Sequence, residues 1–178
     1  MKLEYLLVHG FLAGLAACVA QSSLPGTSLG KYKVVATLAT NTCGSGINAS
    51  NPWNFTVQIS QDGSTLYLAN EDGSDEVSGS FDSTEQTSAT LVSAVTENVN
   101  SAATAGGTTC NLTLATDFAL TFASGSPPPT FTGTATYAYS VATSVSSNTD
   151  CTAQLSSAGG KYSTLPCTVS YSIKGTRQ

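Results

Sequence analysis

Large apolar side chains occupy every second position of residues 53–60, which read Trp-Asn-Phe-Thr-Val-Gln-Ile-Ser. A period of two places all the apolar side chains on one face of a β-strand and the polar ones on the other. Asp62-Gly63 follows, a dipeptide typical of tight β-hairpins, and Leu66 and Leu68 continue the alternation on the returning segment. The sequence therefore predicts a hairpin with one buried face.

Further strands are predicted along the rest of the chain, separated by segments rich in Gly, Pro, Ser and Asp. Only residues 151–158 suggest a helix, and it is short. Together with the hairpin these strands make eight, which predicts an all-β domain: an antiparallel meander barrel of about eight strands, or alternatively a two-sheet β-sandwich. The further segments expected to be strands are residues 31–40, 76–81, 87–97, 108–123, 131–143 and 167–175.

Residues 1–17 have the composition of an export signal. Lys2 gives a positive start, and an apolar run interrupted only by His9 follows up to small residues at its end. Such a run is too short to cross a membrane as a stable helix, so we expect it to be removed. An ordinary secretory signal cut after Ala20 is one interpretation.

The motif Leu15-Ala16-Ala17-Cys18 resembles the lipobox of bacterial lipoproteins. The resemblance implies cleavage before Cys18, a diacylglyceryl group on its thiol and an acyl chain on the new amino group. Two or three chains on one cysteine anchor a protein stably to a bilayer. It thus implies a lipid-anchored protein of the bacterial cell envelope. The outer membrane is favoured because Val19 stands where an aspartate is associated with inner-membrane retention; the alternative is a secreted protein.

We divide the chain into a signal (residues 1–17), a lipidated cysteine with a flexible linker (18–29) and a single β domain (30–178). Gly30-Lys31-Tyr32 at the start of this domain and Gly175-Thr176-Arg177 near its end are similar to the ends of lipocalin-like (calycin) barrels. There, a Gly-x-aromatic motif on the first strand packs near a basic residue late in the chain. The wider pattern also looks like uncharacterised lipoproteins of Gram-negative bacteria, a family that implies no activity.

Charge and histidine content exclude several functions. The chain has 11 acidic against 6 basic residues and a net charge of −5, whereas nucleic-acid binding depends on clustered cations. We therefore expect no nucleic-acid partner. The one histidine, His9, lies in the signal, so the mature chain lacks the usual base of serine and cysteine hydrolases. We expect no enzyme activity and no cofactor.

The remaining cysteines predict two disulfide bonds. Their number is even, and exported proteins reach an oxidising compartment. No CxxC pair is present, which argues against zinc. Of the three possible connectivities we favour Cys151 with Cys167, closing a local loop, and Cys43 with Cys110, joining distant parts of the fold.

Two groups of side chains are candidates for binding. Asp72, Asp75 and Glu76 lie close in sequence and offer oxygen ligands for calcium, although a solvated turn is the simpler interpretation and the EF-hand spacing is absent. Three tyrosines at alternating strand positions would bring hydroxyl groups into a barrel interior, where a ligand or water could bond them. These are Tyr137, Tyr139 and Tyr171.

The leading functional hypothesis is a membrane-anchored, non-enzymatic protein with a structural or interaction role at the cell envelope. The alternative is a lipocalin-like carrier of a small apolar or amphipathic ligand, and a remote third is a carboxylate-dependent hydrolase. A filled barrel interior would favour the first. An apolar cavity of about 300 Å³ or more lined by the tyrosines would favour the second.

Overall fold

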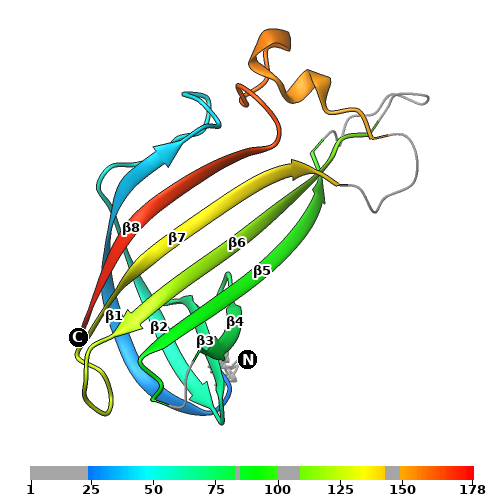
Figure 1. Ribbon diagram of the computed structural model, residues 1–178. Helices are drawn as coiled ribbons and strands as arrows, with labels where there is room; N and C mark the ends of the chain where they lie inside the picture. The colour runs from blue at the N-terminus through cyan, green and yellow to red at the C-terminus, as the bar shows by residue number, and fades with distance from the viewer. Residues whose placement is uncertain (1–23, 83–84, 100–108, 143–148) are drawn as a thin grey trace, which may run out of the picture.

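The computed structural model describes residues 24–82, 85–99, 109–142 and 149–178. Within these residues, eight antiparallel strands follow one another in chain order, and β1 pairs with β8 to close a barrel (Figure 1). The predicted meander barrel is confirmed, and the sandwich alternative is excluded by this closure. The strands are β1 (Thr27–Asn41), β2 (Trp53–Asp62), β3 (Thr65–Asn70), β4 (Val77–Phe81), β5 (Ser88–Asn98), β6 (Asn111–Phe122), β7 (Thr130–Val141) and β8 (Cys167–Arg177).

The strands differ in length, and this gives the barrel two unlike ends. β3 and β4 have 6 and 5 residues, whereas β5 to β8 have 11 or 12 and β1 has 15. Because β4 pairs with β5 only as far as Val92, residues 93–98 of β5 extend past it. Figure 1 shows the long strands rising beyond the short ones. We call this the upper end; the β1–β2, β3–β4, β5–β6 and β7–β8 connections lie there.

The lower half of the barrel is filled with apolar side chains. Tyr32 and Phe131 are fully buried, and their rings lie 5.4 Å apart. The Tyr32 hydroxyl donates a 2.7 Å hydrogen bond to the carbonyl of Pro128 in the β6–β7 turn. This bond fastens the turn beneath the barrel. Further fully buried side chains of the core are Val34, Val57, Ile59, Leu66, Leu91 and Leu120.

The two motifs that resemble the ends of lipocalin-like barrels lie side by side. Tyr32 on β1 pairs with Arg177 on β8. A Cβ atom on Gly30 would lie 3.2 Å from Cδ of Arg177, so the glycine leaves room for the arginine side chain. This is the arrangement that the resemblance implies, while membership of the family stays a prediction.

The first strand begins earlier than expected. Residues 27–29 belong to the predicted flexible linker, but Thr27 pairs with Gln61 in β2, and the Ser60 hydroxyl donates a 2.6 Å hydrogen bond to the carbonyl of Pro25. The order of this segment comes from backbone pairing, which side-chain periodicity does not reveal. The predicted signal, Cys18 and the residues up to 23 lie outside the described residues.

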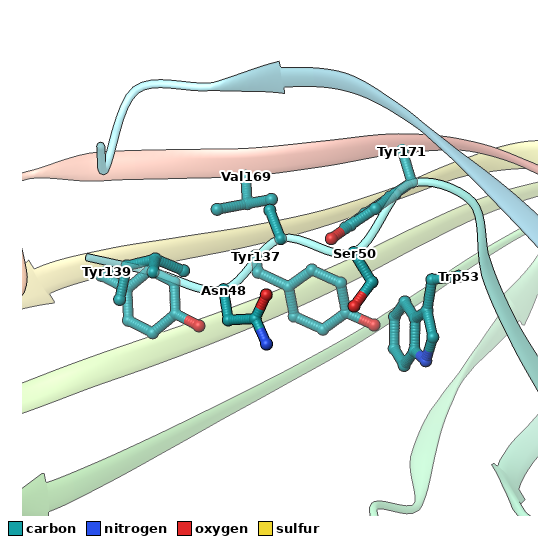
Figure 2. Close-up of a pocket in the computed structure, with 9 residues that line it drawn as sticks. Asn48, Ser50, Trp53, Tyr137, Tyr139, Val169 and Tyr171 are labelled. Atoms are coloured by element: carbon teal, nitrogen blue, oxygen red, sulfur yellow. The ribbon is translucent and has the colours of Figure 1, made fainter. Parts of the chain in front are cut away.

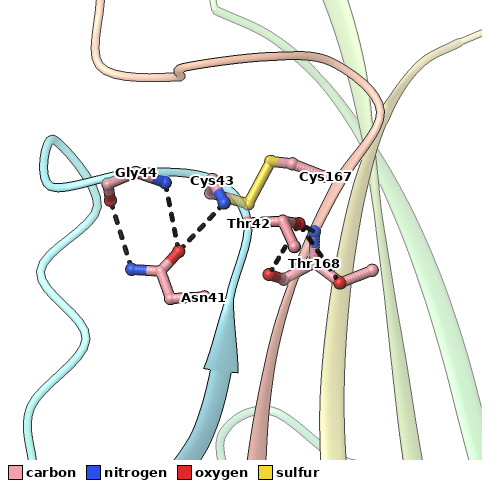
Figure 3. The surroundings of a disulfide bond; sticks show 6 residues. All are labelled: Asn41, Thr42, Cys43, Gly44, Cys167 and Thr168. Carbon is pink, nitrogen blue, oxygen red and sulfur yellow. Dashed lines mark hydrogen bonds between the residues drawn. A yellow bond between two sulfur atoms is a disulfide. The ribbon is translucent and has the colours of Figure 1, made fainter.

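The predicted disulfide connectivity is wrong. The bonds join Cys43 to Cys167 and Cys110 to Cys151. Closure of the barrel places β1 beside β8, so the cysteine just after β1 meets the first residue of β8 (Figure 3). Cys110 directly precedes β6, and a parallel bridge between Thr109 and Thr149 brings Cys151 beside it. Strand adjacency in space, and not distance along the chain, decides the pairs.

Residues 151–158 hold two short 3₁₀ turns, η1 (Thr152–Gln154) and η2 (Ser156–Ala158), where a short helix was expected. In the described part of the chain, no helix is long and apolar enough to cross a membrane.

Candidate functional site

The upper half of the barrel is hollow. A cavity of about 290 Å³ lies in the interior between β2 and β7, and its wall includes Phe55, Ser93, Leu114 and Phe118. A second cavity, of about 240 Å³, lies between the β1–β2 connection and strands β7 and β8. Trp53 and Tyr137 line both cavities. The two spaces therefore adjoin at these two rings.

An aromatic cluster from three strands lines these spaces. Trp53 and Phe55 point inward from β2 because they alternate with polar residues, and their rings stack with centroids 4.3 Å apart. The Trp53 centroid is 5.6 Å from that of Tyr171 on β8 and 6.3 Å from that of Tyr137 on β7. Tyr137 and Tyr171 meet edge to face. Such pairs hold the rings in defined positions.

The three tyrosines predicted from the sequence as ligand-binding residues all line the smaller cavity. Figure 2 shows the rings of Tyr139, Tyr137 and Trp53 following one another, with Asn48 and Ser50 on the β1–β2 connection beside them. The structure thus brings the three predicted tyrosines together at one cavity.

The hydroxyl groups of Tyr137, Tyr139 and Tyr171 have no hydrogen-bond partner among the described residues. No side-chain oxygen of the described residues is sealed from solvent without a partner, so these hydroxyls open into the cavity. Tyr171 is only 5% exposed as a whole residue. A buried side chain with an unpaired hydroxyl at a cavity wall can bond a ligand or water.

Burial keeps these phenols neutral. It raises the pKa of Tyr137 strongly, and the nearby Tyr171, Tyr139 and the Asp75 carboxylate raise that pKa further. Burial also raises the pKa of Tyr139 and of Tyr171. At neutral pH each hydroxyl can therefore both donate and accept a hydrogen bond.

The acidic residues of the β3–β4 loop do not form the predicted metal site. Asp72 accepts hydrogen bonds from the backbone N–H and the hydroxyl of Ser74, at 2.9 and 2.7 Å, which lower the pKa of Asp72. Asp75 accepts one of 2.8 Å from the Asn70 amide. Among the described residues no group of three or more side chains is arranged to hold a metal ion. The carboxylates cap the loop instead.

Asp75 and Glu76 nevertheless belong to the site, because both line the larger cavity. The sequence groups Asp75 and Glu76 with Asp72, and it places Trp53 only on the buried face of a hairpin. Whether an inward side chain fills a core or lines a cavity depends on the side chains opposite it. Nothing in the local alternation carries that information.

The fold and the site define an eight-stranded antiparallel barrel with an aromatic-lined cavity in its upper half. No family model matches the chain, and neither the curated proteins nor the solved structures contain a significant match.

Proposed function

We propose that the protein is a carrier that binds one small apolar or amphipathic molecule in the upper half of its barrel. The observation that carries this proposal is the hollow, aromatic-lined interior with three unpaired tyrosine hydroxyls. Mostly apolar cavities with a few placed polar groups are the usual form of small-molecule sites. The cavity that the three tyrosines line is about 240 Å³, smaller than the size expected of a carrier, but it adjoins a second space of about 290 Å³. Together the two spaces suit one compact ligand.

The hollow favours a carrier over a purely structural role. An eight-stranded barrel is just wide enough to fill itself with side chains or to hold one small ligand. The lower half is filled, but in the upper half Trp53 and Phe55 stay partly exposed. Burial of apolar surface contributes about 25 cal/mol per Å² to the free energy of folding. A barrel that leaves these large rings partly exposed is therefore less stable than one whose interior is filled.

Hydrolysis is supported less well. Glycoside hydrolysis uses two carboxylates that flank the bond to be cut. Asp75 and Glu76 are neighbours in the chain and line the cavity from the same loop. This arrangement suits an electrostatic contact with a ligand more than attack from two sides.

Fluorescence of Trp53 tests the carrier function, because it is the only tryptophan in the chain and lies at the junction of the two cavities. The neutral dye N-phenyl-1-naphthylamine is the probe. We expect saturable energy transfer from Trp53 to the dye with one site per chain. Transfer that never saturates would overturn the proposal.

A cavity-filling variant provides the matched control. Ser93 lines the larger cavity from β5, so Ser93→Phe should abolish or strongly weaken dye binding. Val92, its neighbour, is 57% exposed, and Val92→Phe should leave dye binding unchanged. Circular dichroism establishes that both variants fold, and the smaller substitution Ser93→Leu serves if Ser93→Phe does not. Equal dye affinity in a folded Ser93 variant would contradict the proposal.

The proposal places this carrier on a bacterial membrane through acylated Cys18, which the lipobox motif supports. β1 begins at the lower end of the barrel (Figure 1), so the N-terminal linker joins the domain at the end opposite the cavities. The intact mass of protein extracted from membranes should exceed that of a Cys18→Ser variant by the diacylglyceryl group and an acyl chain. An unmodified chain that starts at Gln21 would instead indicate a freely secreted carrier.

A further inference from the structure

We infer that the ligand is an organic cation, in which an amine or quaternary ammonium group is attached to an apolar body. The inference rests on the proposed function and names the chemical class of the ligand. It comes from the combination, around one cavity, of aromatic rings and carboxylates that form no ion pair with a described residue.

Three aromatic rings line the larger cavity, those of Trp53, Phe55 and Tyr137. The face of an aromatic ring is electrically negative and attracts a cation within about 6 Å, with tryptophan the strongest of the three. The stacked pair of Trp53 and Phe55 and the tilted Tyr137 bring three such rings to one place.

Two carboxylates, those of Asp75 and Glu76, line the same cavity as these rings. Neither forms an ion pair with a described residue. A groove lined by Trp53, Phe55, Glu71 and Asp72 adjoins it. Glu71 is paired with Lys31 at 2.8 Å. In the larger cavity, by contrast, the charges of Asp75 and Glu76 have no cationic partner in the described part of the chain.

No described Lys or Arg lines either cavity or the groove, and the charge of Lys31, which reaches the groove residue Glu71, is matched by that carboxylate. Lys161 lies at the upper end, 5.4 Å from the ring of Tyr162. Burial, and to a smaller extent the nearby Tyr139 and the Glu97 carboxylate, raise the pKa of Tyr162. An anionic ligand would therefore meet carboxylates and negative ring faces, while a cation would find both complementary.

The unpaired hydroxyls complete the recognition. Tyr171 is nearly fully buried and its hydroxyl opens into the adjoining cavity. A phenol oxygen accepts a hydrogen bond from an ammonium N–H, and its O–H can donate to a polar group elsewhere on the ligand. Trp53 and Tyr137 line both cavities, so they lie between this hydroxyl in the smaller cavity and the carboxylates that line the larger one.

Three probes with one apolar body and different charge test the inference by displacement of bound N-phenyl-1-naphthylamine from the full chain. They are 4-phenylbutylamine, which is cationic at pH 7, the neutral 4-phenylbutanol and the anionic 4-phenylbutyrate. We expect the amine to bind about tenfold or more tightly than the alcohol, and the butyrate most weakly. This preference should shrink in high salt, because exposed charges are screened.

Charge-neutral variants identify the residues responsible. Asp75→Asn with Glu76→Gln should reduce the affinity for the amine about tenfold, and should change the affinity for the neutral alcohol and the neutral dye far less. Asparagine tolerates the left-handed backbone of Asp75, with φ of 53°, so the loop should keep its shape. The control Asp62→Asn with Asp117→Asn removes the same charge at exposed sites and should leave all three affinities unchanged.

The outcomes separate this inference from the proposed function. If the dye binds and all three probes displace it equally, the inference is overturned and the carrier function stands. If the dye does not bind saturably, both fail together. A loss of amine affinity equal in the Asp62/Asp117 control would show a general charge effect and overturn the assignment to Asp75 and Glu76.

Discussion

Cys43 and Cys167 lie 124 residues apart in the sequence, and their disulfide bond fastens the end of β1 to the start of β8. The bond stands at the seam where the barrel closes. Beside it, the backbone N–H of Thr42 donates to the carbonyl of Thr168, and the backbone N–H of Thr168 donates to the Thr42 hydroxyl, both at 2.8 Å (Figure 3). The seam is thus closed by covalent and hydrogen bonds together.

Replacing both Cys43 and Cys167 by alanine should lower the free energy of unfolding by about 2–5 kcal/mol, since the bond restricts a long loop of the unfolded chain. Urea unfolding followed by Trp53 fluorescence measures this. The Cys110→Ala, Cys151→Ala pair is the comparison, because that bond spans only 41 residues and should contribute somewhat less. Identical unfolding of the wild-type protein with and without reductant would contradict the prediction.

Tyr32→Phe should lower the free energy of unfolding by about 1–2 kcal/mol, because it leaves the Pro128 carbonyl without its 2.7 Å hydrogen bond while the ring still packs on Phe131. Tyr67→Phe is the control: Tyr67 lies on the outer face of β3, and its hydroxyl has no partner among the described residues. Urea unfolding of both variants gives the comparison. An equal loss in the two would show that the bond to Pro128 contributes nothing.

The strands could be predicted from sequence because alternation is a local property. The alternation from Trp53 to Ile59 does not depend on the rest of the chain. The predicted hairpin follows it, with Gly63 and Ser64 as the two residues between β2 and β3. The disulfide pairs could not be predicted, since Cys43 meets Cys167 only after β1 and β8 close the barrel. The order of the strands around the barrel determines which cysteines meet, and their spacing along the chain does not show that order.

The site was predictable only in part, for a related reason. Inward positions such as Tyr137 and Tyr171 follow from periodicity, and the structure places both at the cavity. The hollow itself arises because β3 and β4 are short, so part of the wall facing the upper rings is missing. A pattern within one strand says nothing about the length of the strand across the barrel.

Gly175→Ala should destabilise the protein by about 1–3 kcal/mol through overpacking. A Cβ atom at this position would lie 2.2 Å from Cε1 of Phe131, and Phe131 is buried in the core. Phe131→Leu in the same chain should relieve part of the clash, so the double variant should lose less than the sum of the single ones. Strictly additive losses in thermal unfolding would show that the two residues do not compete for space.

Tyr137 should make stability fall at high pH. A phenol in an unfolded chain ionises near pH 10, while burial, the neighbouring phenols and Asp75 raise the pKa of Tyr137 in the folded protein. The folded state therefore holds its proton more tightly, so the stabilisation is complete below about pH 10 and is lost as pH rises above it. Urea unfolding between pH 8 and 11 should show this decline, and Tyr137→Phe should make it shallower without removing it, since burial also raises the pKa of Tyr139 and Tyr171.

Absorbance at 295 nm during an alkaline titration gives an independent reading of the same phenols. Tyr137→Phe should remove the phenol that ionises at the highest pH. Asp75→Asn should shift that ionisation to lower pH, because a nearby negative charge opposes formation of the phenolate. If the titration and the pH dependence of unfolding are the same in Tyr137→Phe as in the wild-type protein, then Tyr137 does not lie in the dry, negatively charged surroundings described above. The case for a cation near its ring would then be weaker as well.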